Sequence, residues 1–321
     1  MALTRSPILG SRTTDSDHNN TYWSPSVQYS KQQLAILTRF FSSTTLRDVA
    51  SLNFSQRFNQ LIDESPIASL PLFDTTVGEI FDEAFNILKA KGNRDDYVYR
   101  TALVQKILLG KHSLNTATLL NETRIGHRKV DLGILNGTST AYEIKSERDS
   151  LSRLLPQLNS YEKVFARVNV VTSENHLKHI TELVPKHVGL ILLSKRFTLQ
   201  TIREASEDPD RLDSLSILDV LRTSEAKDVL ANLKREVPEV PNTQIRTELA
   251  GVFKNLPPKL VHDQMVTTIR INRSQRNLAS FVDSVPSSLK AAALTTPLNS
   301  NEQTGLREAI ATRLEVALSR R

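Results

Sequence analysis

The stretch from His127 to Tyr161 constrains the fold of this chain more than any other segment. It contains two apolar runs with strand character, Val130–Leu135 and Thr140–Ile144, and the dipeptide Asn136-Gly137 lies between them. An Asn-Gly pair between two such runs is the strongest short sequence signal for a β-hairpin, because both residues tolerate the positive φ that the turn requires. We therefore expect the two runs to form adjacent antiparallel strands.

Three ionisable residues, Asp131, Glu143 and Lys145, stand on these strands. Charges avoid a central sheet unless they are paired or bind a metal. The two-residue period of a strand puts Glu143 and Lys145 on one face, and the hairpin can set Asp131 on that same face. Two carboxylates beside a lysine predict a site for a hard divalent cation, Mg²⁺ or Mn²⁺, which prefers oxygen ligands. Such a cation lowers the pKa of a bound water, and Lys145 could orient or deprotonate that water or stabilise developing charge.

The order and spacing of these residues resemble the PD-(D/E)XK phosphodiesterase superfamily. Asp131 is followed, after an eleven-residue gap, by Glu143-Ile144-Lys145. Val130 occupies the position before the aspartate at which members of that superfamily commonly have proline. Downstream, Gln157-x3-Tyr161 resembles the Gln-x3-Tyr helix of the RecB-like nuclease branch. The longer string Y-E-I-K-S-E-x-D-x-L-x-R-L, which begins at Tyr142, is similar to a largely uncharacterised bacterial family assigned to the same superfamily.

The resemblance implies an α/β fold in which helices flank a mixed central sheet, as in the restriction endonucleases. It implies a metal-dependent nuclease in which Asp131 and Glu143 bind Mg²⁺ (or Mn²⁺) and Lys145 assists the attacking water. Gln157 and Tyr161 would shape the site and position the strand. The bacterial family also has an acidic residue one strand earlier, which Glu122 would match as a further metal ligand. The RecB-like branch acts mostly on DNA, and the implied setting is defence, repair or a mobile element of bacteria or phage.

Basic residues flank the predicted site on both sides in the sequence. Arg124, Arg128 and Lys129 precede Asp131, and Arg153 follows the second strand. We expect these four side chains to contact nucleic-acid phosphates; the alternatives are a solvated turn for the first three and polar capping for Arg153. The net charge of +6 and the isoelectric point of about 9.5 agree with a polyanionic partner.

The composition excludes several classes of chemistry. The chain has no cysteine, which rules out disulfides, thiolate catalysis and cysteine-ligated zinc and agrees with a reducing cytoplasm. No apolar run reaches the roughly 18 residues of a membrane span. We therefore expect a cytoplasmic protein that has no membrane partner.

The spacing of apolar residues and prolines predicts four regions: an irregular arm over 1–30, helices over 31–93, the nuclease-like core over 94–195 and helices over 196–321. The order of elements in the core is α-β-β-β-α-β-α-β. Its second helix is expected over 150–164, with Asp149 as its cap, and Pro156 predicts a kink or a late start. After the core every candidate segment is helical, beginning with 199–206. These helical regions would choose the substrate or bind a protein partner, and the N-terminal and C-terminal helices could be continuous in space.

A rival interpretation from the same residues is a catalytically inactive nuclease fold. Such a protein would act as a nucleic-acid-binding or protein-binding component of a larger assembly. The convergence of Asp131, Glu143 and Lys145 in space would distinguish the two. The residues themselves do not separate DNA from RNA, endonuclease from exonuclease action, or one oligomeric state from another.

Overall fold

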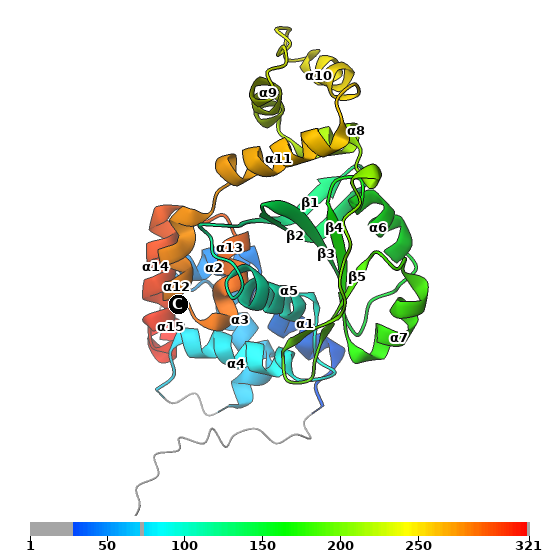
Figure 1. The fold of residues 1–321 in the computed structure, drawn as a ribbon. Helices are drawn as coiled ribbons and strands as arrows, with labels where there is room; N and C mark the ends of the chain where they lie inside the picture. Colours follow the sequence, from blue (N-terminus) through cyan, green and yellow to red (C-terminus); the bar gives the residue numbers. More distant parts are fainter. Residues whose placement is uncertain (1–27, 71–73, 320–321) are drawn as a thin grey trace, which may run out of the picture.

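A six-stranded mixed sheet forms the centre of the protein in the computed structural model, which describes residues 28–70 and 74–319 (Figure 1). The strands lie in sequence order across the sheet. The first three are antiparallel neighbours, the third to fifth are parallel, and the sixth returns antiparallel to the fifth. This arrangement confirms the predicted α/β class. The strands are β1 (Thr118–Ile125), β2 (Arg128–Asn136), β3 (Thr138–Lys145), β4 (Arg167–Thr172), β5 (Gly189–Leu193) and β6 (Leu199–Arg203).

Helices surround this sheet and dominate both ends of the described chain, as predicted. The irregular arm predicted over residues 1–30 lies almost entirely outside the described residues. The N-terminal helices are α1 (Lys31–Arg39), α2 (Ser43–Ala50), α3 (Gln56–Glu64) and α4 (Val77–Lys89). Those within the core are α5 (Asp96–Leu103), its π-helical continuation η2 (Val104–Leu108), α6 (Leu154–Tyr161) and α7 (Glu174–Leu183). The C-terminal helices are α8 (Ser214–Val220), α9 (Thr223–Asn232), α10 (Ile245–Phe253), α11 (Pro258–Asn272), α12 (Ala279–Ser284), α13 (Lys290–Thr295), α14 (Ser300–Ala311) and α15 (Leu314–Ser319). Short 3₁₀ turns are η1 (Pro66–Ser69), η3 (Pro209–Arg211), η4 (Arg276–Leu278) and η5 (Ser287–Leu289).

The predicted hairpin joins β2 to β3. Asn136 pairs with Thr138, and Gly137 at the tip has a φ of +69°, which a glycine adopts without the steric cost of a Cβ. The turn brings Val130–Leu135 and Thr140–Ile144 alongside each other, as the sequence predicts.

Each face of the sheet buries its own hydrophobic cluster, because successive residues of a strand point to opposite sides. Leu132, Tyr142 and Ile144 belong to a cluster shared with the N-terminal helices and α5. Ala141 and Val170 belong to a second cluster, shared with α6 and the helices α8 to α11. Side chains on alternate positions of β3 therefore face two different environments.

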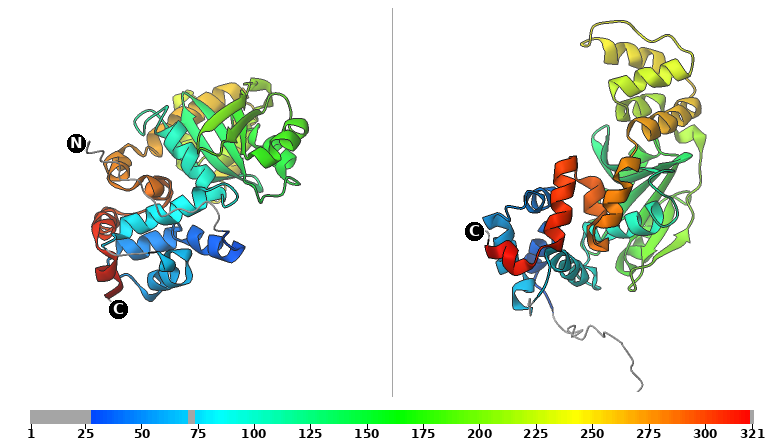
Figure 2. Two further views of the ribbon diagram at one scale, coloured as in Figure 1. Left: turned by 90° about the horizontal axis from the view of Figure 1, so that it is seen from below. Right: turned by 90° about the vertical axis from the view of Figure 1, so that its left-hand side faces the viewer.

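The N-terminal helices and the end of the chain form one helical body, which confirms that they are continuous in space (Figure 2). Phe40, Phe58 and Phe81 pack edge-to-face or tilted in its centre. Where α14 crosses α2, a Cβ on Gly305 would lie 2.0 Å from the carbonyl oxygen of Ala50. Only glycine permits this close crossing.

The helices α8 to α11 instead pack on the sheet and project from it (Figure 1). A buried contact attaches α11 to β3: Ser139 Oγ lies 2.7 Å from His262 Nε2, and Ser139 Oγ also accepts from the Ala166 N–H at 3.0 Å. His262 Nδ1 lies 3.1 Å from a carboxylate oxygen of Asp263. The serine and the histidine are almost fully buried, and burial lowers the pKa of His262, so this triad holds two elements together rather than meeting a substrate.

The sixth strand corrects the sequence prediction, which expected a helix over 199–206. Residues Leu199–Arg203 extend the sheet instead: Thr201 pairs with Ile191, and the guanidinium of Arg203 donates to the carbonyls of Val188 and Pro185. This edge strand forms a hairpin with β5, in which Leu193 pairs with Leu199, and its side chains are half-buried or exposed, so the sequence shows no apolar alternation that would reveal it. The sheet therefore extends beyond residue 195.

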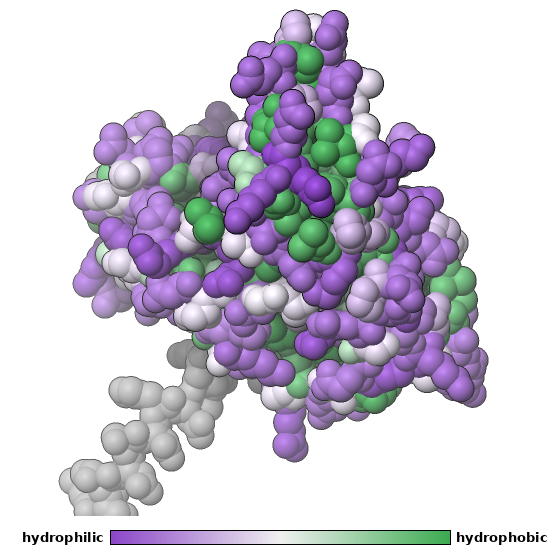
Figure 3. All heavy atoms as spheres, turned by 45° about the horizontal axis from the view of Figure 1, so that its top comes forward, coloured by the Kyte–Doolittle hydropathy of each residue, from purple (hydrophilic) through white to green (hydrophobic). Residues whose placement is uncertain are grey.

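Hydrophilic residues cover most of the molecular face drawn in Figure 3, in keeping with the 24% of charged residues. Within residues 28–70 and 74–319, no helix combines the length and the apolar character that crossing a membrane requires.

Candidate active site

The two predicted carboxylates face each other where β2 and β3 separate. Backbone pairing between these strands ends at Leu132 and Tyr142, so Asp131 and Glu143 occupy the next opposed positions. There the carboxylate of Asp131 accepts the N–H of Ile144 at 2.7 Å, which takes the place of a backbone partner from β2. The opening of the hairpin thus leaves room for side chains between two strands.

A hydrogen-bonded group surrounds Glu143 on the side of the sheet that α6 covers. Lys145 Nζ donates to Glu143 Oε1 at 2.6 Å and to Gln157 Oε1 at 3.1 Å. The Tyr161 hydroxyl lies 2.8 Å from Glu143 Oε2 and 2.7 Å from the carbonyl oxygen of Lys129, both of which are acceptors. Gln157 Nε2 donates to the Tyr161 hydroxyl at 3.4 Å. Both oxygens of Glu143 are therefore held in place.

The structure brings together the five residues that the sequence assigned to catalysis. Two of them, Gln157 and Tyr161, come from α6, where a spacing of four residues puts them on one side of the helix. The helix starts at Leu154, so the late start predicted from Pro156 is confirmed. Asp149 does not cap this helix; its carboxylate accepts the N–H and hydroxyl of Ser146 and shapes the loop before α6.

Burial and like charge disfavour a second negative charge at the site. Glu143 is 1% exposed and Lys145 is 7% exposed, so the ion pair is shielded from water. Burial, followed by the charge of Glu143, raises the pKa of Asp131 from 3.8 to about 8. Burial and the charge of Glu143 also raise the pKa of Tyr161. At neutral pH the Asp131 carboxyl therefore retains a proton, which a bound cation would displace.

We expect Asp131→Asn to stabilise the metal-free protein, and the gain should increase as pH rises. The folded protein binds more protons than the unfolded chain between pH 3.8 and about 8, so Asp131 costs stability progressively as pH rises through that window. Asparagine can still accept the Ile144 N–H. Each unit of pKa shift corresponds to about 1.4 kcal/mol of stability. Because water reaches part of the Asp131 carboxyl and reduces the cost of its charge, we expect the gain in stability above pH 8 to be smaller than the full shift implies, on the order of 1–3 kcal/mol.

Denaturant unfolding in EDTA from pH 5 to 9 measures this gain. The matched control is Asp210→Asn, which changes an exposed aspartate on η3. Equal pH profiles for the wild type and Asp131→Asn would contradict the assigned protonation.

Asp131 and Glu143 fit a hard divalent cation, which can bind through one or two carboxylates and several waters. The structure does not place Glu122 with these two carboxylates as a third ligand. Across the described ranges, no three His, Asp or Glu side chains are grouped so that they could hold a metal ion. By register Glu122 stands opposite Asp131, but its φ of +48° interrupts the regular strand. Its carboxylate bonds to Lys129 at 2.5 Å and lies 3.6 Å from Arg100. In this conformation Glu122 is therefore not grouped with Asp131 and Glu143, and its role as a third ligand stays a prediction.

The basic residues lie on the edges of the site. Arg124 and Lys129 pair across the β1–β2 hairpin, with Arg128 beside them, and the Lys129 carbonyl contacts Tyr161 directly. Lys129 is already paired with Glu122. Arg153 is exposed immediately before α6. Within the described part of the chain, none of the three arginines takes part in an ion pair, so their charges are available to a polyanion.

Sequence reasoning missed the contribution of α5 to the site. The charge of Asp96 on this helix helps to raise the pKa of Asp131, after burial and Glu143. Arg100, one turn later, binds Asp96 at 2.8 Å and also the Asn121 side chain. The spacing of Asp96 and Arg100 signals an i,i+4 ion pair, but nothing in the sequence places that pair near Asp131.

Comparison with known proteins places the chain in a family. Residues 89–296 match the family described as bacteriophage P4 protein cII. The chain is also similar to "Protein cII" of Enterobacteria phage P4, with 35% identity over 131 residues, which are 38% of this chain and 48% of that protein. The chain thus spans about half the length of this curated relative. No solved structure matches the chain. Because the family match covers more than half of the 321 residues, the chain belongs to the bacteriophage P4 protein cII family.

Proposed function

We propose that this protein is a divalent-cation-dependent nuclease, a phosphodiesterase whose preferred substrate is DNA. The observation that carries the proposal is the connected group of Glu143, Lys145, Gln157 and Tyr161 beside Asp131 at the opening between β2 and β3. A purely structural ion pair would need only Glu143 and Lys145. The additional carboxylate of Asp131 has a raised pKa, so its charge costs stability in the metal-free protein, and perturbed carboxylates of this kind are typical of functional sites.

In the proposed mechanism, Asp131 and Glu143 hold Mg²⁺ or Mn²⁺. The cation supplies two effects when bound: it acidifies water and neutralises charge on the scissile phosphate. Lys145 accepts a proton from the attacking water when it is the neutral amine or, as the ammonium, donates a hydrogen bond to the developing charge on the phosphate. Both roles need the Lys145 nitrogen to stay fixed, and Gln157 and Glu143 hold it from two directions.

Tyr161 and the basic residues have positioning roles in this mechanism. The Tyr161 hydroxyl places its single proton between the second oxygen of Glu143 and the Lys129 carbonyl of β2, and so positions Glu143 relative to that strand. Arg124, Arg128 and Arg153 bind phosphates of the substrate strand on either side of the scissile bond. DNA is preferred to RNA here because the nuclease branch that the motif resembles acts mostly on DNA. The relative in phage P4 supports a setting in a mobile element or in defence.

Glu143→Gln is expected to abolish cation-dependent cleavage and leave the fold intact. Glutamine keeps the shape of the buried side chain but removes the charge that binds the cation. The measurement is cleavage of a mixture of single- and double-stranded DNA and RNA, linear and circular, with Mg²⁺ or Mn²⁺, beside thermal unfolding of each variant.

Glu182→Gln on the exposed side of α7 is the matched control and should cleave like the wild type. Cleavage by a well-folded Glu143→Gln protein would reject the site. A wild type that binds nucleic acid in this assay and cleaves none of it would instead favour the non-catalytic binding protein.

A further inference from the structure

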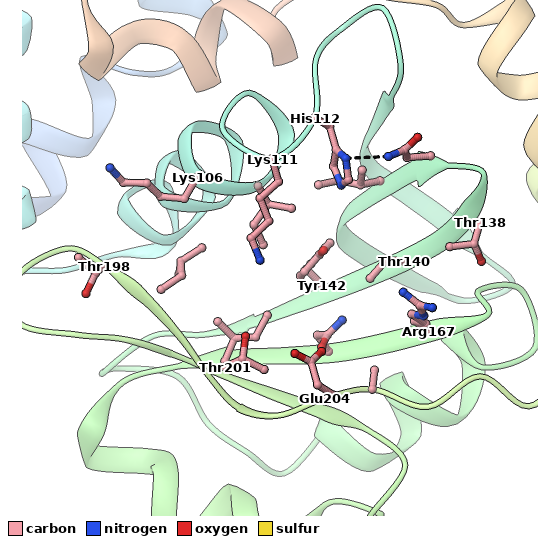
Figure 4. A pocket seen from close by; sticks show the side chains of 17 residues that line it. Lys106, Lys111, His112, Thr138, Thr140, Tyr142, Arg167, Thr198, Thr201 and Glu204 are labelled. Carbon is pink, nitrogen blue, oxygen red and sulfur yellow. Dashed lines mark hydrogen bonds between the residues drawn. The ribbon is translucent and has the colours of Figure 1, made fainter.

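A cavity of about 410 Å³ lies on the face of the sheet opposite to the candidate active site (Figure 4). Tyr142 points into it, whereas the next residue of β3, Glu143, points to the other face. The strands contribute Thr140, Tyr142, Asn169 and Thr201 to its floor, and η2 with the turn after it covers the opposite side. The cavity is therefore separate from the carboxylates and Lys145.

The floor of this cavity presents polar groups that the protein does not use. Tyr142 and Asn169 are each only 7% exposed. In residues 28–70 and 74–319, no hydrogen bond involves the Tyr142 hydroxyl, the Asn169 amide or the hydroxyls of Thr140 and Thr201. Of these four residues Tyr142 and Asn169 are buried, Thr140 is half-buried and Thr201 is exposed. Because the polar groups of buried residues are ordinarily hydrogen-bonded, the Tyr142 hydroxyl and the Asn169 amide favour a partner that enters the hollow. The amide and hydroxyls together offer both donors and acceptors.

The charges around the cavity favour an anion. Lys111 extends toward the strands and Lys106 lies at the edge of the cavity (Figure 4). Neither lysine takes part in an ion pair among the described residues. Arg167 also lines the cavity and has Glu207 as its partner at 3.0 Å, and Glu204 is the one lining carboxylate. Because Glu207 offsets the charge of Arg167, two unpaired lysines face Glu204 alone and leave positive charge at the hollow.

We propose that this cavity binds a small phosphorylated ligand of mononucleotide size. Its phosphate would lie between Lys106 and Lys111, and its heterocyclic ring would meet Tyr142 and the amide of Asn169. The volume lies within the range of about 300–1,000 Å³ that is usual for small-molecule sites. The heterocyclic ring of such a ligand is only partly polar, so it also needs apolar contacts. Apolar side chains complete the walls of the cavity: Ile107, Ile134, Ile191 and Leu199.

Isothermal titration of the full chain with nucleoside 5′-monophosphates, their parent nucleosides and inorganic phosphate tests the proposal. At least one nucleoside monophosphate should bind about tenfold or more tightly than either its nucleoside or phosphate, because only it engages both ends of the cavity. The double variant Lys106→Ala/Lys111→Ala should weaken this binding by about tenfold or more, and Tyr142→Phe by a few fold.

The control Lys178→Ala/Lys254→Ala removes two exposed lysines elsewhere and should keep the affinity of the wild type. Glu143→Gln should also keep it, because the active site lies on the other face. The proposal is overturned if no nucleoside monophosphate binds more tightly than phosphate, if the control weakens binding as much as the cavity variants do, or if Glu143→Gln removes it.

Discussion

Lys145→Ala is expected to slow cleavage by about a hundredfold or more and to change the affinity for DNA by no more than a few fold. Lys145 is 7% exposed and its ammonium is bonded to Glu143 and Gln157, so it does not reach outward to a substrate phosphate in the ground state. A group of this kind acts on charge that develops in the transition state, and its removal lowers the turnover more than the binding. The measurement is the single-turnover rate at saturating enzyme, with affinity measured in Ca²⁺ to block the chemistry.

Three further variants make this experiment decisive. Lys145→Arg should restore little activity, because the guanidinium is bulkier and cannot accept a proton. Lys254→Ala changes an exposed lysine immediately after α10 and should match the wild type. Gln157→Leu tests positioning: it removes one of the two acceptors that hold Lys145 and should lower the rate less than Lys145→Ala does. If the affinity falls sharply and the single-turnover rate does not, Lys145 is a docking residue and the proposed mechanism is wrong.

Much of the core could be predicted because the sequence signals that specify it come from residues close together in the chain. The Asn136-Gly137 turn joins two runs whose alternation is visible in the sequence, and the register that follows sets Asp131 opposite Glu143. The two-residue period also puts Lys145 on the face of Glu143, and the four-residue spacing of Gln157 and Tyr161 puts both on one side of α6. Each of these steps depends on neighbours within one hairpin or one helical turn.

The features that sequence reasoning missed depend on non-local contacts. Glu122 has the register position of a third ligand, but its positive φ and its contacts with Lys129 and Arg100 take the carboxylate elsewhere. The strand Leu199–Arg203 is an exception, because it pairs with β5 in a local hairpin; it was missed because its half-buried and exposed side chains lack the alternation of a strand. The cavity is lined by residues from five strands and η2, so no single segment of the sequence predicts it.

Arg94 is the strongest example of a residue whose importance only the tertiary structure reveals. Its side chain is 2% exposed and lies between the end of α4 and the end of β5. Nε donates to the carbonyl of Lys89 at 2.8 Å, one terminal nitrogen donates to Ser194 at 2.7 Å, and the other donates to Lys195 at 2.8 Å. The guanidinium thereby ties the N-terminal helices to the sheet, and burial lowers its pKa.

Arg94→Met is expected to destabilise the protein by about 3 kcal/mol or more, because it leaves three partly buried carbonyls without the buried donor that binds them while it preserves most of the side-chain volume. Thermal unfolding should show a fall in Tm on the order of 5 °C or more. Arg94→Lys should recover only part of the loss, because an ammonium at the end of a flexible chain cannot reach three carbonyls in the fixed geometry of a guanidinium. Arg39→Met, at an exposed arginine of α1, controls for the change of charge and should unfold like the wild type. If Arg94→Met also unfolds like the wild type, the helical body and the sheet are held together by hydrophobic packing alone, and the hydrogen bonds of Arg94 contribute nothing to their association.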